Sequence, residues 1–422
     1  MEHSGERAAK RRKSLKKALG IALAGLLTAV NFMPSVQSLR NLPENIRIST
    51  GQSQSFSFAL PVEVKVEQES AVVSLSGDER LGIQGENSGS ANLTFSLMGL
   101  PVKQVTVKVE NERIVMPGGA AVGIAMYTDG VFVVDCADVF LPDGTHKNPA
   151  KEAGLQSGDT ITRLGSEQVR GMQDLLSIVK NSTSNTLKIS YTRNGRSYEG
   201  RISPVVDESG ARRLGLWVRD STAGIGTLTY FDMAAKRFGA LGHAITDVDT
   251  LQILPIRDGD VYPSKIVDVK KGEKGSPGEL HGVFSDGQQK IGTINKNTDY
   301  GVYGSPQGGF VNPLYPQGLP VGTQSSVHPG RATILATIDE GGIREFDCQI
   351  IRVTPQLAPA QRSMVIQVTD PELLQKTGGI VQGMSGSPIL QDGHLIGAVT
   401  HVYVNDPTRG YGLFLDWMLD MQ

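Results

Sequence analysis

Apolar and polar residues alternate along the chain from about residue 42 to residue 109. The runs VEVKV (62–66) and VTVKV (105–109) show this two-residue period. The period is typical of β-strands that bury one face, and the Gly, Asn and Ser residues between the runs indicate turns. The pattern therefore predicts a small β-rich domain over residues 39–113, a sandwich or a similar fold. No chemistry is visible in it, and we interpret it as a spacer or an interaction module.

The pattern changes after residue 114, where one helical segment interrupts the strands. MQDLLSIV (172–179) has the spacing of an amphipathic helix, with strands expected before and after it. Over residues 206–422 short strands and glycine-rich turns return, with almost no helical periodicity apart from a short helix expected at 371–376. This arrangement favours a double β-barrel, so the predicted fold class is mainly β.

The first 38 residues resemble an export signal. The basic run KRRK (10–13) and Lys16-Lys17 precede an apolar run from Ala18 to Met33. Such an order predicts a cytoplasmic basic stretch followed by a signal peptide or a membrane anchor. The apolar run is short for a membrane span, and the small residues at 36–38 suit signal cleavage. A cleaved signal peptide and an uncleaved anchor both fit these observations.

Composition narrows the class of protein. The chain has 422 residues, which suggests two or three domains, and a net charge of −2, which argues against nucleic acid as its main partner. Its 50 glycines suit a β-rich fold with many loops. Two cysteines, Cys136 and Cys348, are too few for a disulfide framework and are interpreted as buried free thiols. No metal-ligand spacing is present, and no cofactor is expected.

The hexapeptide GMSGSP (383–388) carries the strongest chemical signal. A serine attacks a carbonyl only if a base takes its proton and nearby donors stabilise the oxyanion. Ser385, on a tight glycine-flanked loop, resembles the nucleophile of chymotrypsin-like proteases. Gly383 is free to place its amide beside that of Ser385 as an oxyanion hole, and we expect Gly386 to leave room for substrate. A turn without chemistry is the alternative, and the presence of a base decides between the two.

His243, in the run GALGHAITD (239–247), is the expected base. A catalytic triad needs one imidazole beside the serine hydroxyl, and this histidine lies among small and apolar residues. His401, in an apolar strand near the nucleophile, is its main rival, although a structural role suits it better. The remaining histidines have the surroundings of surface or leader residues: His3, His146, His281, His328 and His394.

A carboxylate should orient the imidazole and stabilise its protonated form. Asp370 ends an apolar strand, a place from which a side chain can point into a cleft, and it ranks first. Asp249 ranks behind it, and Asp247 is also close to His243 in sequence. Aspartates that precede a proline at the end of a strand are also ordinary turn formers, so the third member stays open among these residues.

Residues 150–161 read AKEAGLQSGDTI, a run that closely resembles a PDZ domain of the bacterial protease type. The resemblance implies a PDZ domain over residues 114–205, which adds a peptide to its sheet as an extra strand. It places the peptide groove at Gly119, Val122, Gly123 and Ile124. A PDZ fold that serves only for packing is the alternative, and peptide binding is favoured.

Three segments together resemble a known peptidase family. They are RDSTAGIGT (219–227), GALGHAITDVDT (239–250) and GGIVQGMSGSP (378–388), the last followed by GAVTHVYVNDP (397–407). They are similar to the stage IV sporulation protein B serine peptidases of endospore-forming bacteria. The resemblance implies a peptidase domain over residues 206–422, with Ser385 as nucleophile, His243 as base and Asp370 as the proposed third member.

The same resemblance implies a signalling role. Such peptidases are exported into the space between the forespore and mother-cell membranes, where they cleave themselves and a membrane-anchored regulator. This cleavage releases an intramembrane protease that activates a late mother-cell sigma factor. The expected partners are therefore protein substrates, the chain itself and, through the N-terminal segment, the membrane. A catalytically silent PDZ adaptor and a structural envelope protein are the alternatives, but a serine, a histidine and a carboxylate together favour the active endopeptidase.

Overall fold

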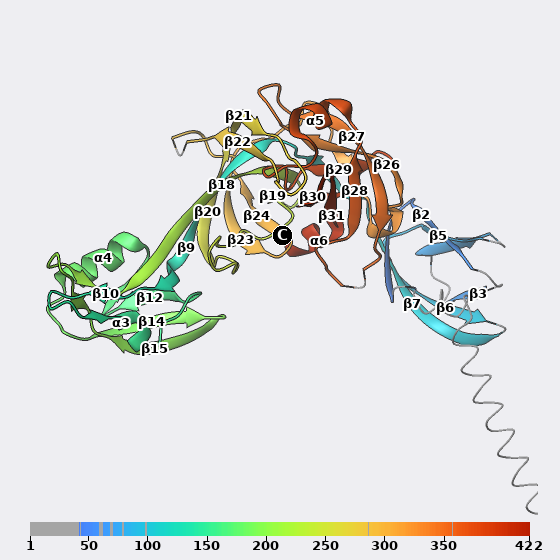
Figure 1. Ribbon diagram of the computed structural model, residues 1–422. Coiled ribbons are helices and arrows are strands. Elements are labelled where there is room, and N and C mark those ends of the chain that lie inside the picture. The colour runs from blue at the N-terminus through green and yellow to red at the C-terminus, as the bar shows by residue number, and fades with distance from the viewer. Residues whose placement is uncertain are drawn as a thin grey trace, which may run out of the picture. The chain divides into compact units, whose positions relative to one another are not determined.

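The computed structural model describes residues 42, 44–58, 62–67, 71–77, 80–97, 99–285, 287–356 and 358–422 (Figure 1). The predicted signal or anchor at residues 1–38 lies outside the described residues. In the described part of the chain, no helix combines the length and the apolar character that crossing a membrane requires. The chain divides into two compact units, Met1–Glu112 and Arg113–Gln422.

The first unit is a pair of β-sheets around one apolar core. One sheet has the order β1 (Asn45–Ser49), β7 (Leu100–Glu110), β6 (Gly89–Leu97) and β3 (Val62–Glu67). The other has the order β2 (Ser53–Ser57), β5 (Arg80–Gly85) and β4 (Val73–Ser76). Ile83 of the second sheet packs in the same core as Phe95 and Val107 of the first. The alternating pattern predicted this β architecture, because every second residue of these strands faces that core.

The second unit contains two closed barrels of six strands. Successive neighbours in the first are β9 (Ala121–Cys136), β20 (Ile256–Pro263), β23 (Gly292–Thr298), β24 (Gly301–Pro306), β19 (Arg237–Ala240) and β18 (Leu216–Asp232). Antiparallel pairing of β18 with β9, which joins Ala121 to Thr227, closes this barrel. Its core includes Val122, Ile124 and Phe238. Closure leaves no exposed sheet edge around the barrel.

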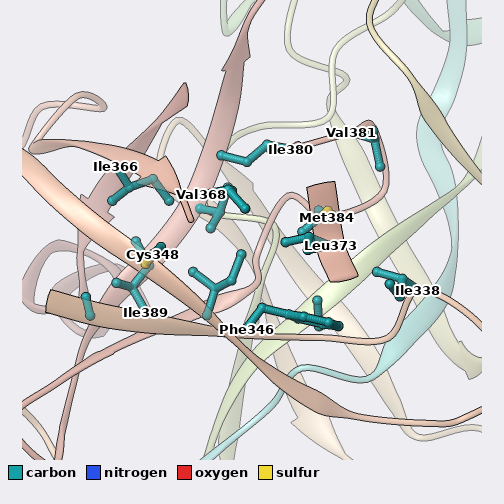
Figure 2. Close-up of a cluster of buried hydrophobic side chains, with 14 of the residues drawn as sticks. Ile338, Phe346, Cys348, Ile366, Val368, Leu373, Ile380, Val381, Met384 and Ile389 are labelled. Atoms are coloured by element: carbon teal, nitrogen blue, oxygen red, sulfur yellow. The ribbon is translucent and has the colours of Figure 1, made fainter. Parts of the chain in front are cut away.

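The second barrel has the order β26 (Gly330–Ala336), β27 (Arg344–Val353), β28 (Met364–Val368), β31 (Asp406–Phe414), β30 (His394–Tyr403) and β29 (Pro388–Gln391). Figure 2 shows Phe346, Ile366 and Ile389 gathered in its core. Two helices accompany this barrel, α5 (Pro371–Thr377) and α6 (Leu415–Met421). The helix predicted at 371–376 is confirmed as α5.

A separate lobe grows out of the first barrel (Figure 1, green). Strand β9 continues beyond the barrel and pairs with β12 (Thr160–Leu164), which is followed in the sheet by β14 (Leu187–Arg193) and β15 (Arg196–Ile202). Helices α3 (Pro149–Glu152) and α4 (Met172–Asn181) complete the lobe. Its core combines Val131 of β9, Ile178 of α4 and Ile189 of β14. The content of strands and helices is that of the PDZ-type unit that the sequence predicted.

The strand pairing shows that this lobe is an insertion in the sequence of the first barrel and does not precede the barrel. Residues 121–127 and 221–227 pair with each other as neighbouring barrel strands, and the lobe lies between them in the sequence. The predicted boundaries, with a PDZ domain at 114–205 and a peptidase domain at 206–422, therefore need correction. Both β9 and β18 run through barrel and lobe without a break, so no turn signal marks the boundary.

The remaining elements are short. They are β8 (Ile114–Pro117), β10 (Val139–Phe140), β11 (His146–Lys147), β13 (Glu167–Gln168), β16 (Val205–Val206), β17 (Arg212–Arg213), β21 (Lys265–Lys270), β22 (Glu279–Val283), β25 (Leu319–Pro320) and the 3₁₀ helix η1 (Gln324–Ser326).

Candidate active site

The loop before β29 is anchored in the second barrel by the side chain of Met384. Met384 is fully buried, and Figure 2 shows it beside Leu373 of α5. Ser385, the next residue, is only half-buried. Gly383 has a φ of 94°, in the left-handed region that favours glycine. The anchor at Met384 and the turn at Gly383 thus present Ser385 at the surface of the barrel.

A cavity of ≈ 760 Å³ joins the predicted nucleophile and the predicted base. Ser385 and Gly383 line it from the second barrel, and His243 lines it from the loop that follows β19 of the first barrel. His401 of β30 also lines it, with its ring centroid 5.1 Å from that of His243. The structure therefore brings Ser385, His243 and the rival histidine to one site.

In this structure the two main side chains bond to backbone carbonyls. The Ser385 hydroxyl donates to the carbonyl of Thr400 at 2.8 Å. The Nδ1 atom of His243 lies 2.7 Å from the carbonyl oxygen of Ala244. A carbonyl only accepts hydrogen bonds, so Nδ1 carries the proton and Nε2 keeps the lone pair that a base needs. Rotation of the Ser385 hydroxyl away from Thr400 is required before His243 can take its proton.

Burial lowers the pKa of both histidines that line the cavity. It lowers the pKa of His243, and the hydrogen bond to Ala244 opposes that shift. Burial also lowers the pKa of His401, to about 4, with the neighbouring charges of His243 and Arg362 acting in the same direction. Both rings are therefore neutral at pH 7, the state in which an imidazole accepts a proton.

Asp370 lies outside the cavity, at the start of helix α5. Its carboxylate accepts the N–H of Leu373 at 2.9 Å, the usual contact of a helix N-cap, and lies 3.5 Å from the N–H of Asp347. The structure thus gives Asp370 a capping role instead of the predicted contact with His243. The reason is local, since an aspartate before a proline at a helix start satisfies an N–H that otherwise has no partner.

The carboxylates of Asp247 and Asp249, which are the alternatives to Asp370, both contact Arg219. Asp247 is fully buried and forms an ion pair with Arg219, and Asp249 lies 3.0 Å from the same guanidinium. Within the described part of the chain, neither hydrogen bonds to His243. Asp299, which the sequence reading missed, does line the cavity. It lies in the turn between β23 and β24, where no local sequence signal distinguishes it from an ordinary turn residue.

Two backbone amides beside Ser385 are available as donors. Among the described residues, no carbonyl accepts the N–H of Gly383 or of Ser385. The carbonyls of the same two peptide groups point to the opposite side and accept hydrogen bonds there. The carbonyl of Gln382 accepts the N–H of Leu280, and the carbonyl of Met384 accepts the N–H of Ser387. In a trans peptide the N–H points away from the carbonyl, so both amides are held in the orientation that leaves them free. This arrangement suits the predicted oxyanion hole.

Gly386 serves packing and not substrate access. It is buried, and a Cβ atom there would lie 2.1 Å from the carbonyl oxygen of Thr227 and 2.5 Å from the amide nitrogen of Leu241. The expectation that Gly386 leaves room for substrate is therefore wrong. Its missing side chain instead lets the nucleophile loop approach the backbone of the first barrel.

The residues predicted to form the PDZ groove lie in or next to the first barrel, not in the lobe. Val122, Gly123 and Ile124 belong to β9 of the first barrel, and Gly119 lies just before this strand. Val122 and Ile124 are in the barrel core, and a Cβ at Gly123 would strike the ring of Phe284. The prediction is wrong because this segment forms a barrel strand, although a PDZ-like pattern follows it.

The lobe has a cavity of its own, of ≈ 980 Å³, between α4 and the first residues of β18. Leu175 and Leu176 line it from the helix, and Trp217 and Val218 line it from the strand. Trp217 is 67% exposed and Leu176 is 51% exposed. The pairings of β18 with β19 and β8 involve only residues 228–232, so among the described strands β9 alone pairs with β18 near Trp217.

The two cysteines carry no visible chemistry. Both are free thiols, with Cys348 buried and Cys136 half-buried. Cys348 lies in the core of the second barrel (Figure 2), where burial raises the pKa of its thiol to about 12. Over the described residues, no cluster of His, Cys, Asp and Glu side chains has the arrangement of a metal site.

Comparison with known proteins places the chain among peptidases. A sequence model of the SpoIVB peptidase S55 family matches residues 210–419. A protein of Treponema pallidum (strain Nichols), provisionally named a zinc metalloprotease, is 30% identical over 99 residues, which are 23% of this chain. The chain spans only 21% of the length of that curated relative.

Two solved structures also resemble parts of the chain. The PDZ domain of the SdrC-like protein of Listeria monocytogenes is 23% identical, with a TM-score of 0.17, and the match covers 21% of this chain and 87% of that domain. The Rv3671c protease of M. tuberculosis in its active form is 13% identical, with a TM-score of 0.29, and the match covers 47% of this chain and 72% of that protein. The family match spans the last part of the lobe, most of the first barrel and all of the second. Through residues 210–419 the chain belongs to the SpoIVB peptidase S55 family, and it is a serine peptidase.

Proposed function

We propose that this serine peptidase uses Ser385 as nucleophile, His243 as general base and the amides of Gly383 and Ser385 as its oxyanion hole. One observation carries the proposal. Ser385 and His243 come from different barrels, yet they line one cavity beside two amides that have no partner among the described residues.

The steps follow from this geometry. The Ser385 hydroxyl turns from Thr400, passes its proton to Nε2 of His243 and forms a bond from Oγ to the substrate carbonyl carbon. The carbonyl oxygen becomes an oxyanion, which accepts hydrogen bonds from the two amides. The imidazolium then gives its proton to the leaving amine, and the C–N bond breaks to leave an acyl-enzyme. Water, with His243 again as base, hydrolyses the ester and restores Ser385.

The carbonyl of Ala244 takes the position that a carboxylate has in a triad. It accepts the Nδ1–H of His243 and so fixes the tautomer and the orientation of the ring. A carbonyl dipole stabilises an imidazolium less than a full negative charge does. His243 therefore works as a base with partial support, and we attribute no direct contact with the ring to Asp370.

The biological role that we propose follows the family. The protein is exported, acts between the forespore and mother-cell membranes, and cleaves itself and a membrane-anchored regulator of an intramembrane protease. This cleavage leads to activation of a late mother-cell sigma factor. The family match over residues 210–419 supports this role, and the basic and apolar segments before residue 38 support export.

We propose that the lobe selects the substrate. We place its peptide site at the cavity between α4 and β18, where an extended peptide adds to the free side of residues 216–219 and sets apolar side chains against Leu175 and Leu176. The exposed Trp217 at the same place offers a large contact area.

A matched pair of serine variants tests the catalytic assignment. The purified protein, wild type, Ser385→Ala and Ser387→Ala, is followed for self-cleavage on a gel and for labelling by a fluorophosphonate probe. Ser387 is a suitable control, because its hydroxyl is buried two residues away and has no hydrogen-bond partner among the described residues. We expect wild type and Ser387→Ala to label and fragment, and Ser385→Ala to do neither.

Two results would contradict the assignment. Labelling that persists in Ser385→Ala would place the nucleophile elsewhere. A folded wild type that neither labels nor fragments would favour the silent PDZ adaptor instead.

A further inference from the structure

Thr227, the last residue of the motif RDSTAGIGT, contacts both catalytic loops. It lies on β18 of the first barrel and is almost fully buried, with 1% of its surface exposed. Its carbonyl accepts the N–H of Leu241 at 3.2 Å, two residues before His243. Its N–H donates to the carbonyl of Ser385 at 3.0 Å. Its hydroxyl donates to the carbonyl of Gly383 at 2.8 Å.

These contacts join two barrels at one residue. The loop that carries the base and the loop that carries the nucleophile have no common sequence segment, so their separation depends on tertiary contacts. The absence of a side chain at Gly386 allows the close approach, since a Cβ there would lie 2.1 Å from the Thr227 carbonyl oxygen. Backbone bonds to Thr227 would form with any residue at 227, but the bond to Gly383 needs a hydroxyl.

The hydroxyl acts on the most flexible residue of the oxyanion hole. Glycine has access to more backbone conformations than any other residue, so Gly383 needs external contacts to keep one orientation. The peptide before it is held by the bond from Leu280 to Gln382, at 2.9 Å. The peptide after it is held by the Thr227 hydroxyl. Together these two bonds fix both sides of Gly383 and hence the direction of its free N–H.

We propose that Thr227 is a positioning residue for the oxyanion hole, acting through its hydroxyl on the carbonyl of Gly383. The inference rests on the proposed roles of Gly383 and Ser385, and it extends them to a residue of the other barrel. Thr227 does not line the cavity that Ser385 and His243 share, so we expect it to make no contact with substrate. Its effect is therefore on the rate of the chemical step and not on substrate binding.

The same strand supplies a control. Thr229 is also buried, but its hydroxyl has no hydrogen-bond partner in the part of the chain that the structure describes. Replacement of either threonine by valine keeps the shape of the side chain and removes one hydroxyl. Only the change at 227 removes a hydrogen bond to the nucleophile loop. Thr227→Ser keeps the hydroxyl and serves as the rescue variant.

The first readout is catalysis by the intact protein. Hydrolysis of p-nitrophenyl acetate gives kcat and KM, and the rate of fluorophosphonate labelling reports on Ser385. We expect Thr227→Val to lower kcat by about tenfold to a hundredfold, less than the full loss of an oxyanion donor, with KM unchanged. Thr229→Val and Thr227→Ser should both stay within about threefold of wild type.

The second readout does not depend on activity. Hydrogen–deuterium exchange over residues 380–387 is compared in a Ser385→Ala background, with and without Thr227→Val. The N–H of Met384 bonds to Val381 and that of Gly386 bonds to Val399, so both report on the order of this loop. Loss of the Thr227 hydrogen bond should speed their exchange by about fivefold, whereas Thr229→Val should leave it unchanged.

The outcomes separate the two proposals. Unchanged kcat and unchanged exchange in Thr227→Val would overturn the positioning role, and so would an equal loss in Thr229→Val. Faster exchange in Thr227→Val, together with a wild type that does not label, would support the contact but refute the catalytic roles of Ser385 and Gly383.

Discussion

Ser385 and His243 share a cavity, but each is hydrogen bonded to a carbonyl and not to the other. Catalytic hydrogen bonds are often absent or long without substrate and form in the reacting complex. The hydroxyl of Ser385 must turn from Thr400, whereas the Nε2 lone pair of His243 is already available. At the scale of single residues the base thus has a free lone pair, and the nucleophile is still bonded to a carbonyl.

The pH dependence of activity should follow His243. Burial disfavours its protonated form, so its pKa lies below the usual value of 6.5 and the ring stays neutral to lower pH. Activity is present above this lowered pKa and is lost as pH falls through it. We expect the acid limb of kcat/KM, measured with p-nitrophenyl acetate, to have its midpoint below pH 6.5.

His401 is the control for that assignment, because its pKa of about 4 would also produce an acid limb. In His401→Phe the limb should remain if His243 is the base. Disappearance of the limb in His401→Phe, with activity retained in His243→Ala, would reverse the roles of the two histidines.

At the scale of elements, helix α5 connects Asp370 to the nucleophile. Asp370 caps the helix, Leu373 of the same helix is fully buried, and Met384 packs beside it in the core (Figure 2). Met384 precedes Ser385 directly. The cap therefore supports the nucleophile loop through packing, at a distance from the imidazole.

Variants of Asp370 distinguish a cap from a triad member. Asn caps a helix about as well as Asp, so Asp370→Asn should keep both the melting temperature and kcat/KM close to wild type. Asp370→Ala should lose about 1 kcal/mol of stability, measured by urea unfolding, with a modest loss of activity. A fall of about 10⁴ in kcat for a stable Asp370→Asn would instead reveal a direct catalytic partner in the working enzyme.

Local signals in the sequence predicted the local parts of this site. The turn at Gly383 and the helix that starts after Asp370 follow from short-range rules of turns and caps. The position of the Asp370 side chain does not, because an aspartate before proline suits both a cleft and a cap. The contribution of Thr227 was equally hidden, since Gly383, the partner of its hydroxyl, lies 156 residues away in the sequence.

At the scale of the whole second unit, the lobe is an insertion in the first barrel and not a domain in series. The PDZ-type motif at 150–161 was recognisable from sequence, because its glycines and apolar residues are close together. The position of the lobe within the barrel sequence was not recognisable. Only the pairing of Ala121 with Thr227 shows that the barrel starts before the lobe and resumes after it. The peptide groove was misplaced for the same reason.

A charge in the lobe groove should affect protein substrates only. Leu176→Glu places a carboxylate at a half-exposed position of α4, so the fold should tolerate it while apolar peptide contacts weaken. We expect self-cleavage to slow by about tenfold or more, with hydrolysis of p-nitrophenyl acetate unchanged. Leu100→Glu, at an exposed leucine of the first unit, is the matched control.

The result to watch is the ratio of the two activities. A parallel loss of ester hydrolysis and self-cleavage in Leu176→Glu would point to a folding defect. Unchanged self-cleavage would remove the groove from substrate choice.

The closure of the first barrel by β9 and β18 has a consequence for biosynthesis. Strand β9 is made first, but its partner follows only after the entire lobe, and the loops with His243 and Ser385 come later still. Pairings between residues so far apart in sequence form slowly. A chain that is still being made therefore holds no assembled active site. Delayed folding alone would keep this peptidase silent during its own synthesis.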